Sequence, residues 1–320
     1  MTNSPRTPTL LPQVGPERPL RILVAWDQSG EEAIEFAAWV ARTTTTCVRV
    51  ISTAPRPWSS RHNSKSKKYA KWFKKISDER ISAMNAAIKE HIPRDARDAD
   101  GAVFRDGSPR HKLISEEAAN FGADLILLGS KAKAKKGRFL ATSTADAMIH
   151  YSPISVGLAP RAVKLSKKGI TRINYAFLSE REEASAHGIK VAATAAMLLD
   201  VDLRVMAFSP RRTYQYEAEL EPHSQLIDEW NESSLALLDR ARDCISETAE
   251  ALGIPEPKNF EVDTCVSSGD GWKSVVNSQK WKKGDILFLD SNPANRGRVV
   301  ATERTEDFLT HAPVPVVIFP

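Results

Sequence analysis

Basic side chains gather in two places along this 320-residue chain, and both places could bind an anion. Seven lysines and arginines, and no acidic residue, fall between Arg61 and Lys75. The net charge of +5 is thus concentrated in clusters, and such clusters attract negatively charged ligands or partners. The second cluster consists of Lys131, Lys133, Lys135, Lys136 and Arg138.

The chain lacks the residue patterns that mark common enzymes. Its seven histidines form no H-x-x-H or H-E-x-x-H pair, and no G-x-S-x-G turn, Walker loop or pair of catalytic carboxylates is present. Cys47, Cys244 and Cys265 are scattered without C-x-x-C spacing, which argues against a zinc site or a disulfide framework. We therefore expect a protein that is not an enzyme and that has no metal site.

The composition is typical of a soluble globular protein. Hydrophobic residues make up 42% and charged residues 27% of the chain. No stretch approaches the roughly 20 apolar residues that span a bilayer, and the N-terminus lacks the pattern of a secretory signal. We expect a cytoplasmic protein with no membrane partner, and a disordered, proline-rich tail over residues 1–19.

Two halves of the chain repeat one another, which indicates a duplicated domain. The segment 122–131 reads GADLILLGSK, and 283–292 reads KGDILFLDSN. About twenty residues later, HYSPISV at 150–156 is matched by THAPVPV at 310–316. We expect one domain over residues 20–160, a linker over 161–170 and a second domain over 171–320.

Short apolar runs alternate with helical patterns in both halves, which is typical of parallel sheets with helical crossovers. The sequence therefore predicts the α/β class, with two tandem five-stranded parallel Rossmann-like domains. Helices are expected between the strands, including one that begins inside the first basic cluster and ends before Pro93. The expected strands are 21–26, 47–52, 102–104, 125–128 and 154–158, then 173–177, 203–208, 260–266, 286–289 and 314–319.

The first half resembles the universal stress protein domain. The phrase VAWDQS at 24–29, the string ADLILLGS at 123–130 and the closing phrase SPISV at 152–156 carry the resemblance, and APVPVV at 312–317 repeats the last of them. The resemblance implies an adenine-nucleotide α-hydrolase-like fold. It also implies a pseudo-dimer of the two halves, in which the last strands, 154–158 and 314–319, pair with one another.

Members of one branch of this family bind ATP through G-x-x-G-x₉-G-[ST] after the fourth strand. Glycine lets backbone N–H groups approach phosphate, and a helix N-terminus favours anions. Here Gly129 keeps the first glycine, Ala132 and Thr142 replace the others, and Ser143 keeps the hydroxyl. The resemblance thus implies weak binding of ATP or another adenine nucleotide in the first half. The implied site residues are Asp27, Ser52, Gly129, Ser130, Ala132, Thr142 and Ser143.

Structural roles compete with these ligand roles. Asp27 could be a turn residue that caps the next helix, and Ser143 with Thr144 could cap the helix after the glycine motif. The second half departs further from the motif, because Leu178, Asp290 and Pro293 replace the acid and two glycines. We expect no nucleotide there.

The first basic cluster, in an insertion at residues 56–75, leaves a second hypothesis open. Tyr69, Trp72 and Phe73 interleave with its lysines, a composition found on nucleic-acid-binding surfaces, yet the same aromatic residues could seat the helix on the protein. Three functions therefore remain: a nucleotide-binding stress protein, a scaffold for a protein partner or for further dimerisation, and a polyanion-binding module. The polyanion-binding candidates are Lys67, Lys68, Lys71, Lys74 and Lys75.

Overall fold

The fold of the chain is given by a computed structural model. It describes residues 18–56, 67–178, 186–211, 232, 236, 239, 241–250, 262–291, 299 and 301–320. The strands are β1 (Leu20–Ala25), β2 (Thr46–Ala54), β3 (Arg97–Asp106), β4 (Leu125–Gly129), β5 (Ser155–Ala159), β6 (Arg172–Phe177), β7 (Asp202–Arg211), β8 (Val262–Asp270), β9 (Asp285–Asp290) and β10 (Val316–Phe319). The helices are α1 (Glu32–Ala41), α2 (Lys67–His91), α3 (Arg110–Phe121), α4 (Ser143–Tyr151), α5 (Ala186–Leu199), α7 (Gly271–Asn277) and α8 (Glu303–Leu309), with a 3-10 turn η1 (Arg94–Ala96).

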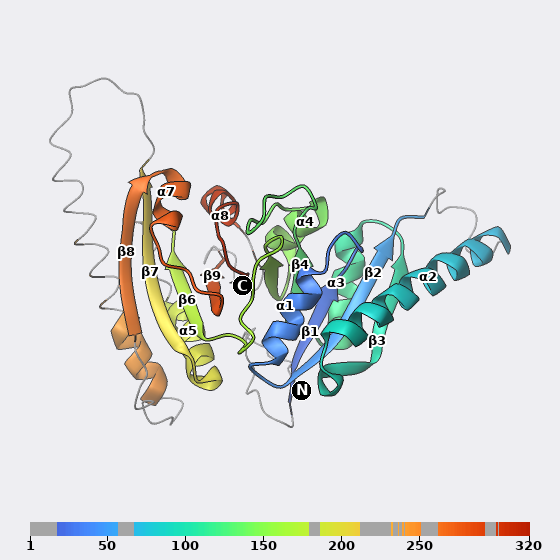
Figure 1. Cartoon of the computed structure of the whole chain (residues 1–320), viewed down its shortest axis with the longest axis horizontal. Coiled ribbons are helices and arrows are strands. Elements are labelled where there is room, and N and C mark those ends of the chain that lie inside the picture. Colours follow the sequence, from blue (N-terminus) through green and yellow to red (C-terminus); the bar gives the residue numbers. More distant parts are fainter. Residues whose placement is uncertain are drawn as a thin grey trace, which may run out of the picture.

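All ten strands belong to one sheet, in the order β3-β2-β1-β4-β5-β10-β9-β6-β7-β8. Each half contributes five strands that are parallel to their neighbours. The halves meet where β5 and β10 run antiparallel, with Gly157 opposite Val317. The predicted α/β class and the predicted pairing of the last strands are therefore confirmed, and Figure 1 shows the two halves side by side with the C-terminus between them.

Helices cover both faces of this sheet, because successive apolar residues of a strand point to opposite sides. Ile22 and Val24 belong to a core that contains residues of α1, α2 and α5, whereas Leu23 belongs to a core that contains residues of α3, α4, α7 and α8. Each core includes residues from both halves. The continuous apolar run of β1 is thus explained by burial on both faces.

Polar contacts join the two halves beside the strand pair. The backbone N–H of Val299 donates to the carbonyl of Ser152 at 2.8 Å, and Arg138 Nη1 donates to the carbonyl of His311 at 2.8 Å. His150 Nε2 lies 2.9 Å from Glu306 Oε1. These contacts fix α4 and the loop before it against the second half.

Helix α2 begins inside the basic cluster and ends before Pro93, as predicted. Its N-terminal end lies at one end of the molecule (Figure 1). Tyr69 Oη donates to Asp106 Oδ2 at 2.9 Å, and the rings of Phe73 and Phe104 lie 5.5 Å apart. The aromatic residues therefore seat the helix on β3, while residues 57–66 of the insertion lie outside the described residues.

Predicted boundaries differ from the structure at β3 and at α4. Strand β3 is longer than the predicted 102–104, because an edge strand pairs on one side only and needs no continuous apolar run. Helix α4 begins at Ser143, one residue earlier than predicted, with Thr142 as its N-cap. The predicted tail at 1–19 falls outside the described residues except for its last two positions. Among the described helices, none has the length and apolar character needed to cross a bilayer.

Candidate functional site

A cavity of about 280 Å³ opens at the carboxyl ends of β1, β2 and β4. It lies at the point where the strand order of the first half reverses, between β1 and β4, which is where open α/β sheets bind their ligands. The helices α3 and α4 contribute their N-termini to its wall. The lining residues used below are Trp26, Asp27, Gly30, Glu32, Ile51, Thr53, Arg110, Gly129, Ser130, Lys131, Thr142, Ser143 and Thr144.

The structure brings five of the seven predicted site residues to this cavity: Asp27, Gly129, Ser130, Thr142 and Ser143. Ser52 and Ala132 do not line it.

Ser52 is buried on β2, and its hydroxyl has no hydrogen-bond partner among the described residues. Its neighbours Ile51 and Thr53 line the cavity instead. Ala132 is exposed in the loop after β4. Thr53 therefore replaces Ser52 as the candidate contact from the second strand.

Asp27 serves the turn between β1 and α1. Its Oδ1 accepts hydrogen bonds from the backbone N–H of Ser29 at 3.0 Å and from the Ser29 hydroxyl at 2.5 Å. The N-cap of α1 is Glu31, so Asp27 does not cap that helix as one interpretation had it. Because Asp27 also lines the cavity, it brings a negative charge to the wall.

The loop between β4 and α4 is folded back on itself. Ser130 Oγ accepts from the N–H of Leu140 at 2.9 Å, and the N–H of Lys131 donates to the carbonyl of Leu140 at 2.9 Å. The N–H groups of Ala134 and Gly137 donate to Lys131 and Arg161, at 2.9 and 2.6 Å. Backbone donors that a glycine-rich loop would offer to phosphate are therefore engaged within the protein.

Helix α4 offers the remaining backbone donors. Thr142 Oγ1 accepts from the N–H of Ala145 at 3.1 Å and so caps the helix. The cap belongs to Thr142, not to Ser143 or Thr144 as one interpretation of the sequence had it. The N–H groups of Ser143 and Thr144 make no hydrogen bond within the described part of the chain, and they belong to residues that line the cavity. A helix N-terminus with free N–H groups favours an anion.

Two cations join these donors. The side chains of Arg110, the first residue of α3, and Lys131 line the cavity, and neither has a hydrogen bond or ion pair in the described regions. Lys133, Lys135 and Lys136, which the sequence grouped with Lys131, are exposed and do not line it. Of the second basic cluster, therefore, only Lys131 belongs to the cavity wall.

Two wall residues went unnoticed in the sequence. Arg110 follows Gly107-Ser108-Pro109, a helix start at the same sheet edge as Asp27, and this spacing could have revealed it. Trp26 lines the cavity, and its indole Nε1 donates to the carbonyl of Gly30 at 2.7 Å. A held indole ring is a flat apolar wall for an aromatic ligand.

The second half has filled the corresponding position. Asp290 stands where the first half has Gly129, and its Oδ2 lies so close to Gly188 of α5 that a Cβ there would be 2.9 Å away. The same Cβ would lie 2.3 Å from the hydroxyl of Tyr175. Leu178 is buried, and α8 begins with Glu303, an acid, where α4 begins with Ser143. Pro293 lies outside the described residues.

Comparisons with known proteins agree with this architecture. Residues 20–160 match the model of the universal stress protein family. The universal stress proteins Rv2319c of Mycobacterium tuberculosis and Mb2346c of Mycobacterium bovis are each 25% identical over 299 residues, which cover 91% of this chain and 96% of the relative. A universal stress protein structure from Archaeoglobus fulgidus covers 93% of this chain and 97% of its own, with a TM-score of 0.60 and 14% identity.

Two α/β halves that share one sheet, with a cavity at the switch point of the first, define a tandem Rossmann-like protein. The family model matches the first half, and the similarity to the mycobacterial universal stress proteins extends over nearly the whole chain. Residues 20–160 are therefore a universal stress protein domain, and the chain as a whole resembles a tandem-domain universal stress protein.

Proposed function

We propose that this protein binds an adenine nucleotide in the cavity of its first half, and that the bound state acts as a regulatory signal in a stress response. One observation carries the proposal: the N–H groups of Ser143 and Thr144 and the side chains of Arg110 and Lys131, which have no hydrogen-bond or ion-pair partner among the described residues, belong to residues that line one cavity. Four such donors suit a phosphate group, and the indole of Trp26 suits a base.

The loop between β4 and α4 has few backbone N–H groups left for a second or third phosphate group of a nucleotide. Because Lys131, Ala134 and Gly137 donate their N–H groups within the protein, we assign the phosphate contacts to the start of α4 and to the side chains of Arg110 and Lys131. Asp27 and Glu32 also line the cavity, so each added phosphate group would be repelled by their negative charges. We expect AMP to bind at least as tightly as ATP, and both with micromolar or weaker affinity.

Binding without catalysis is favoured by the state of the acids. Asp27 is engaged with Ser29, and Glu32 Oε1 accepts from the N–H of Ala162 at 3.3 Å. Among the residues that line the cavity there is no histidine or cysteine. We therefore propose a nucleotide sensor, with hydrolysis no faster than in buffer.

Calorimetric titration with AMP, ADP, ATP and adenosine tests the proposal. Arg110→Gln and Lys131→Gln should each weaken AMP about tenfold or more, because a charged hydrogen bond contributes about 1.5–3 kcal/mol. Lys133→Gln is the matched control, since it removes the same charge from the same loop outside the cavity. If AMP binds wild type and all three variants equally, the site is elsewhere, and if no nucleotide binds wild type, the scaffold hypothesis replaces this one.

A second candidate function, polyanion binding, is favoured by the geometry of α2. At 100° per residue, Lys67, Lys68, Lys71, Lys74 and Lys75 fall within an arc of about 120° on one helix face, and all five are exposed. Tyr69 and Phe73 lie opposite and pack toward β3. The face that projects from the molecule is therefore the basic one.

Nucleic acid is the polyanion that we propose for this lysine face, because a row of lysines neutralises a row of phosphates. Lys67, Lys71 and Lys74 changed together to Gln should weaken binding of a fluorescent DNA duplex and lower its salt dependence. The matched control changes three exposed lysines of the second half, Lys280, Lys282 and Lys283, to Gln. Equal losses in both triple variants would show that total charge, and not this face, holds the duplex.

A further inference from the structure

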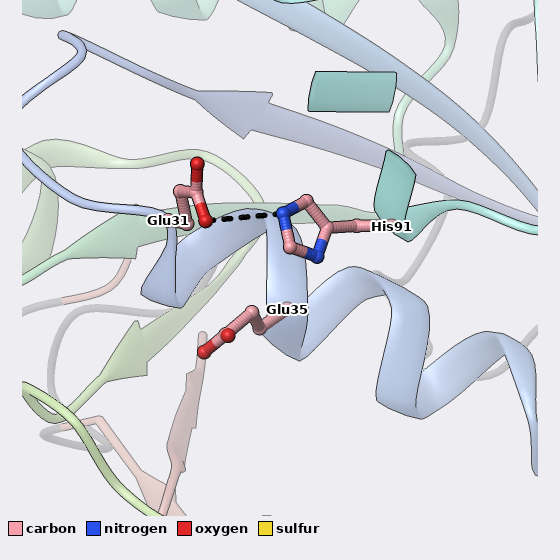
Figure 2. Close-up of side chains that lie close together, drawn as sticks. All are labelled: Glu31, Glu35 and His91. Carbon is pink, nitrogen blue, oxygen red and sulfur yellow. Dashed lines mark hydrogen bonds and ion pairs between the residues drawn. The ribbon is translucent and has the colours of Figure 1, made fainter. Parts of the chain in front are cut away.

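Two acids of α1 and the last residue of α2 meet in space. Figure 2 shows Glu31, the N-cap of α1, Glu35 one helical turn later, and His91. His91 Nε2 lies 3.1 Å from Glu31 Oε2. One ligand atom from each of the three residues can be chosen so that all three lie within 4.8 Å of one another. The group unites an imidazole nitrogen with two carboxylate oxygens.

Among the described residues, the carboxylate of Glu35 has no partner that accounts for its position in the group. Its carboxylate makes no hydrogen bond or ion pair within the described part of the chain, although Glu31 has His91. Glutamates at i and i+4 repel one another, and the dipole of α1 offsets this only in part. The charge of Glu35 is thus poorly compensated.

We propose that Glu31, Glu35 and His91 form a site for a divalent first-row metal ion, with Zn²⁺ as the best-matched ion. Zinc binds imidazole nitrogen at about 2.0–2.1 Å and carboxylate oxygen at about 2.0–2.2 Å, so that tetrahedral ligands lie roughly 3.3 Å apart. The Glu31–His91 pair already has this separation. Glu35 is exposed, and a ligand oxygen of its carboxylate lies within 4.8 Å of the ligand atoms of the other two residues.

The ligand chemistry selects among ions. Mg²⁺ and Ca²⁺ prefer shells made only of oxygen, whereas one imidazole and two carboxylates suit zinc. Three protein ligands leave one position for water, as in open zinc sites. No sequence pattern pointed to this site, because His91 lies 56 residues beyond Glu35 and no short motif contains both.

Bound zinc would connect the start of α1 to the end of α2. Residue Gly30 and the side chain of Glu32, on either side of Glu31, line the cavity of the first half. The metal would therefore hold one wall of that cavity in place. This site stands apart from the proposed nucleotide function, since its ligands do not line the cavity.

Thermal unfolding of the full chain, stripped with EDTA and then given ZnCl₂ or MgCl₂, tests the proposal. Zinc should raise the Tm of wild type, magnesium should not, and calorimetry should give one zinc per chain. His91→Asn and Glu35→Gln should each weaken zinc at least tenfold. Glu35→Gln is the sharper variant, because it leaves the Glu31–His91 ion pair in place and removes a repulsion.

The matched control is His150→Asn. His150 Nε2 pairs with Glu306 Oε1 at 2.9 Å, a histidine–glutamate pair that forms part of no three-ligand group among the described residues. This variant should keep the zinc affinity of wild type. Zinc affinity that is unchanged in Glu35→Gln, or a wild-type protein whose Tm zinc does not raise, would overturn the proposal.

Discussion

Gly129 and Asp290 occupy the same position in the two halves, at the end of β4 and of β9. Gly129 lines the cavity of the first half, whereas Asp290 packs closely against Gly188 of α5 in the second half. A Cβ built on Gly129 would meet only the Cβ of Ala33, at 4.0 Å. Asp290 instead crowds Gly188 together with Tyr175. Packing therefore leaves room for a methyl group at Gly129.

This contrast predicts how two substitutions differ. Gly129→Ala should fold and bind AMP as wild type does, because the added methyl group has room. Gly129→Asp should weaken AMP at least about tenfold, because its carboxylate adds a negative charge beside the phosphate donors. Calorimetry of both variants checks the prediction. Equal binding by Gly129→Asp and wild type would contradict the site assignment.

At the scale of elements, the two halves keep a cap where the family motif has its last glycine. Thr142 accepts from the N–H of Ala145 at 3.1 Å, and Thr302 accepts from the N–H of Thr305 at 3.2 Å. The substitution that weakens the motif therefore stabilises α4 and α8. The position where the ATP-binding motif has a glycine is thus occupied, in both halves, by a threonine that caps the following helix.

Both caps should contribute alike to stability. Thr142→Ala and Thr302→Ala should each lower the free energy of unfolding by about 1 kcal/mol, because each leaves a backbone N–H without its partner. The corresponding Ser variants keep the hydroxyl and should lose much less. Denaturant unfolding measures all four. A loss in the Ser variants as large as in the Ala variants would assign the effect to the methyl group.

The order of elements could be predicted from the sequence, whereas the exact wall of the cavity could not. Apolar runs sufficed for ten strands, and the family resemblance implied the β5–β10 pair. The contact from β2 was misplaced by one residue, and on a strand one residue reverses the side to which the chain points. Arg110 and Trp26 come from separate elements, and only the folded sheet brings them together.

At the scale of the whole molecule, the two halves meet through more than the strand pair, and the pKa of one junction residue, His311, is lowered by its surroundings. Burial lowers the pKa of His311, and the positive charges of Arg138 and Lys273 lower it further. The negative charge of Asp307 raises it, but by less. Arg138 also donates to the His311 carbonyl. The folded junction therefore disfavours a protonated imidazole at position 311.

This shift predicts a loss of stability in acid. The unfolded chain binds a proton at His311 more readily than the folded chain, so this contribution to stability is complete above the ordinary histidine pKa of about 6.5 and is lost as the pH falls below it. His311→Asn should therefore lose less stability than wild type between about pH 7.5 and about pH 5.5. Urea midpoints at the two pH values check this, with His111→Asn as the control for removing an imidazole elsewhere. Parallel losses in wild type and His311→Asn would contradict it.

The place of β10 in the sheet also governs how the protein is made. Of the ten strands in the described residues it leaves the ribosome last, yet it lies at the centre of the sheet beside β5, just before the C-terminus marked between the two halves in Figure 1. Roughly 160 residues separate the two strands, which corresponds to roughly 10–30 s of translation. Throughout that time the edge of β5 is unpaired and open to strands of other nascent chains. The speed of synthesis therefore sets how long the first half is exposed to mispairing, whatever the final stability of the protein.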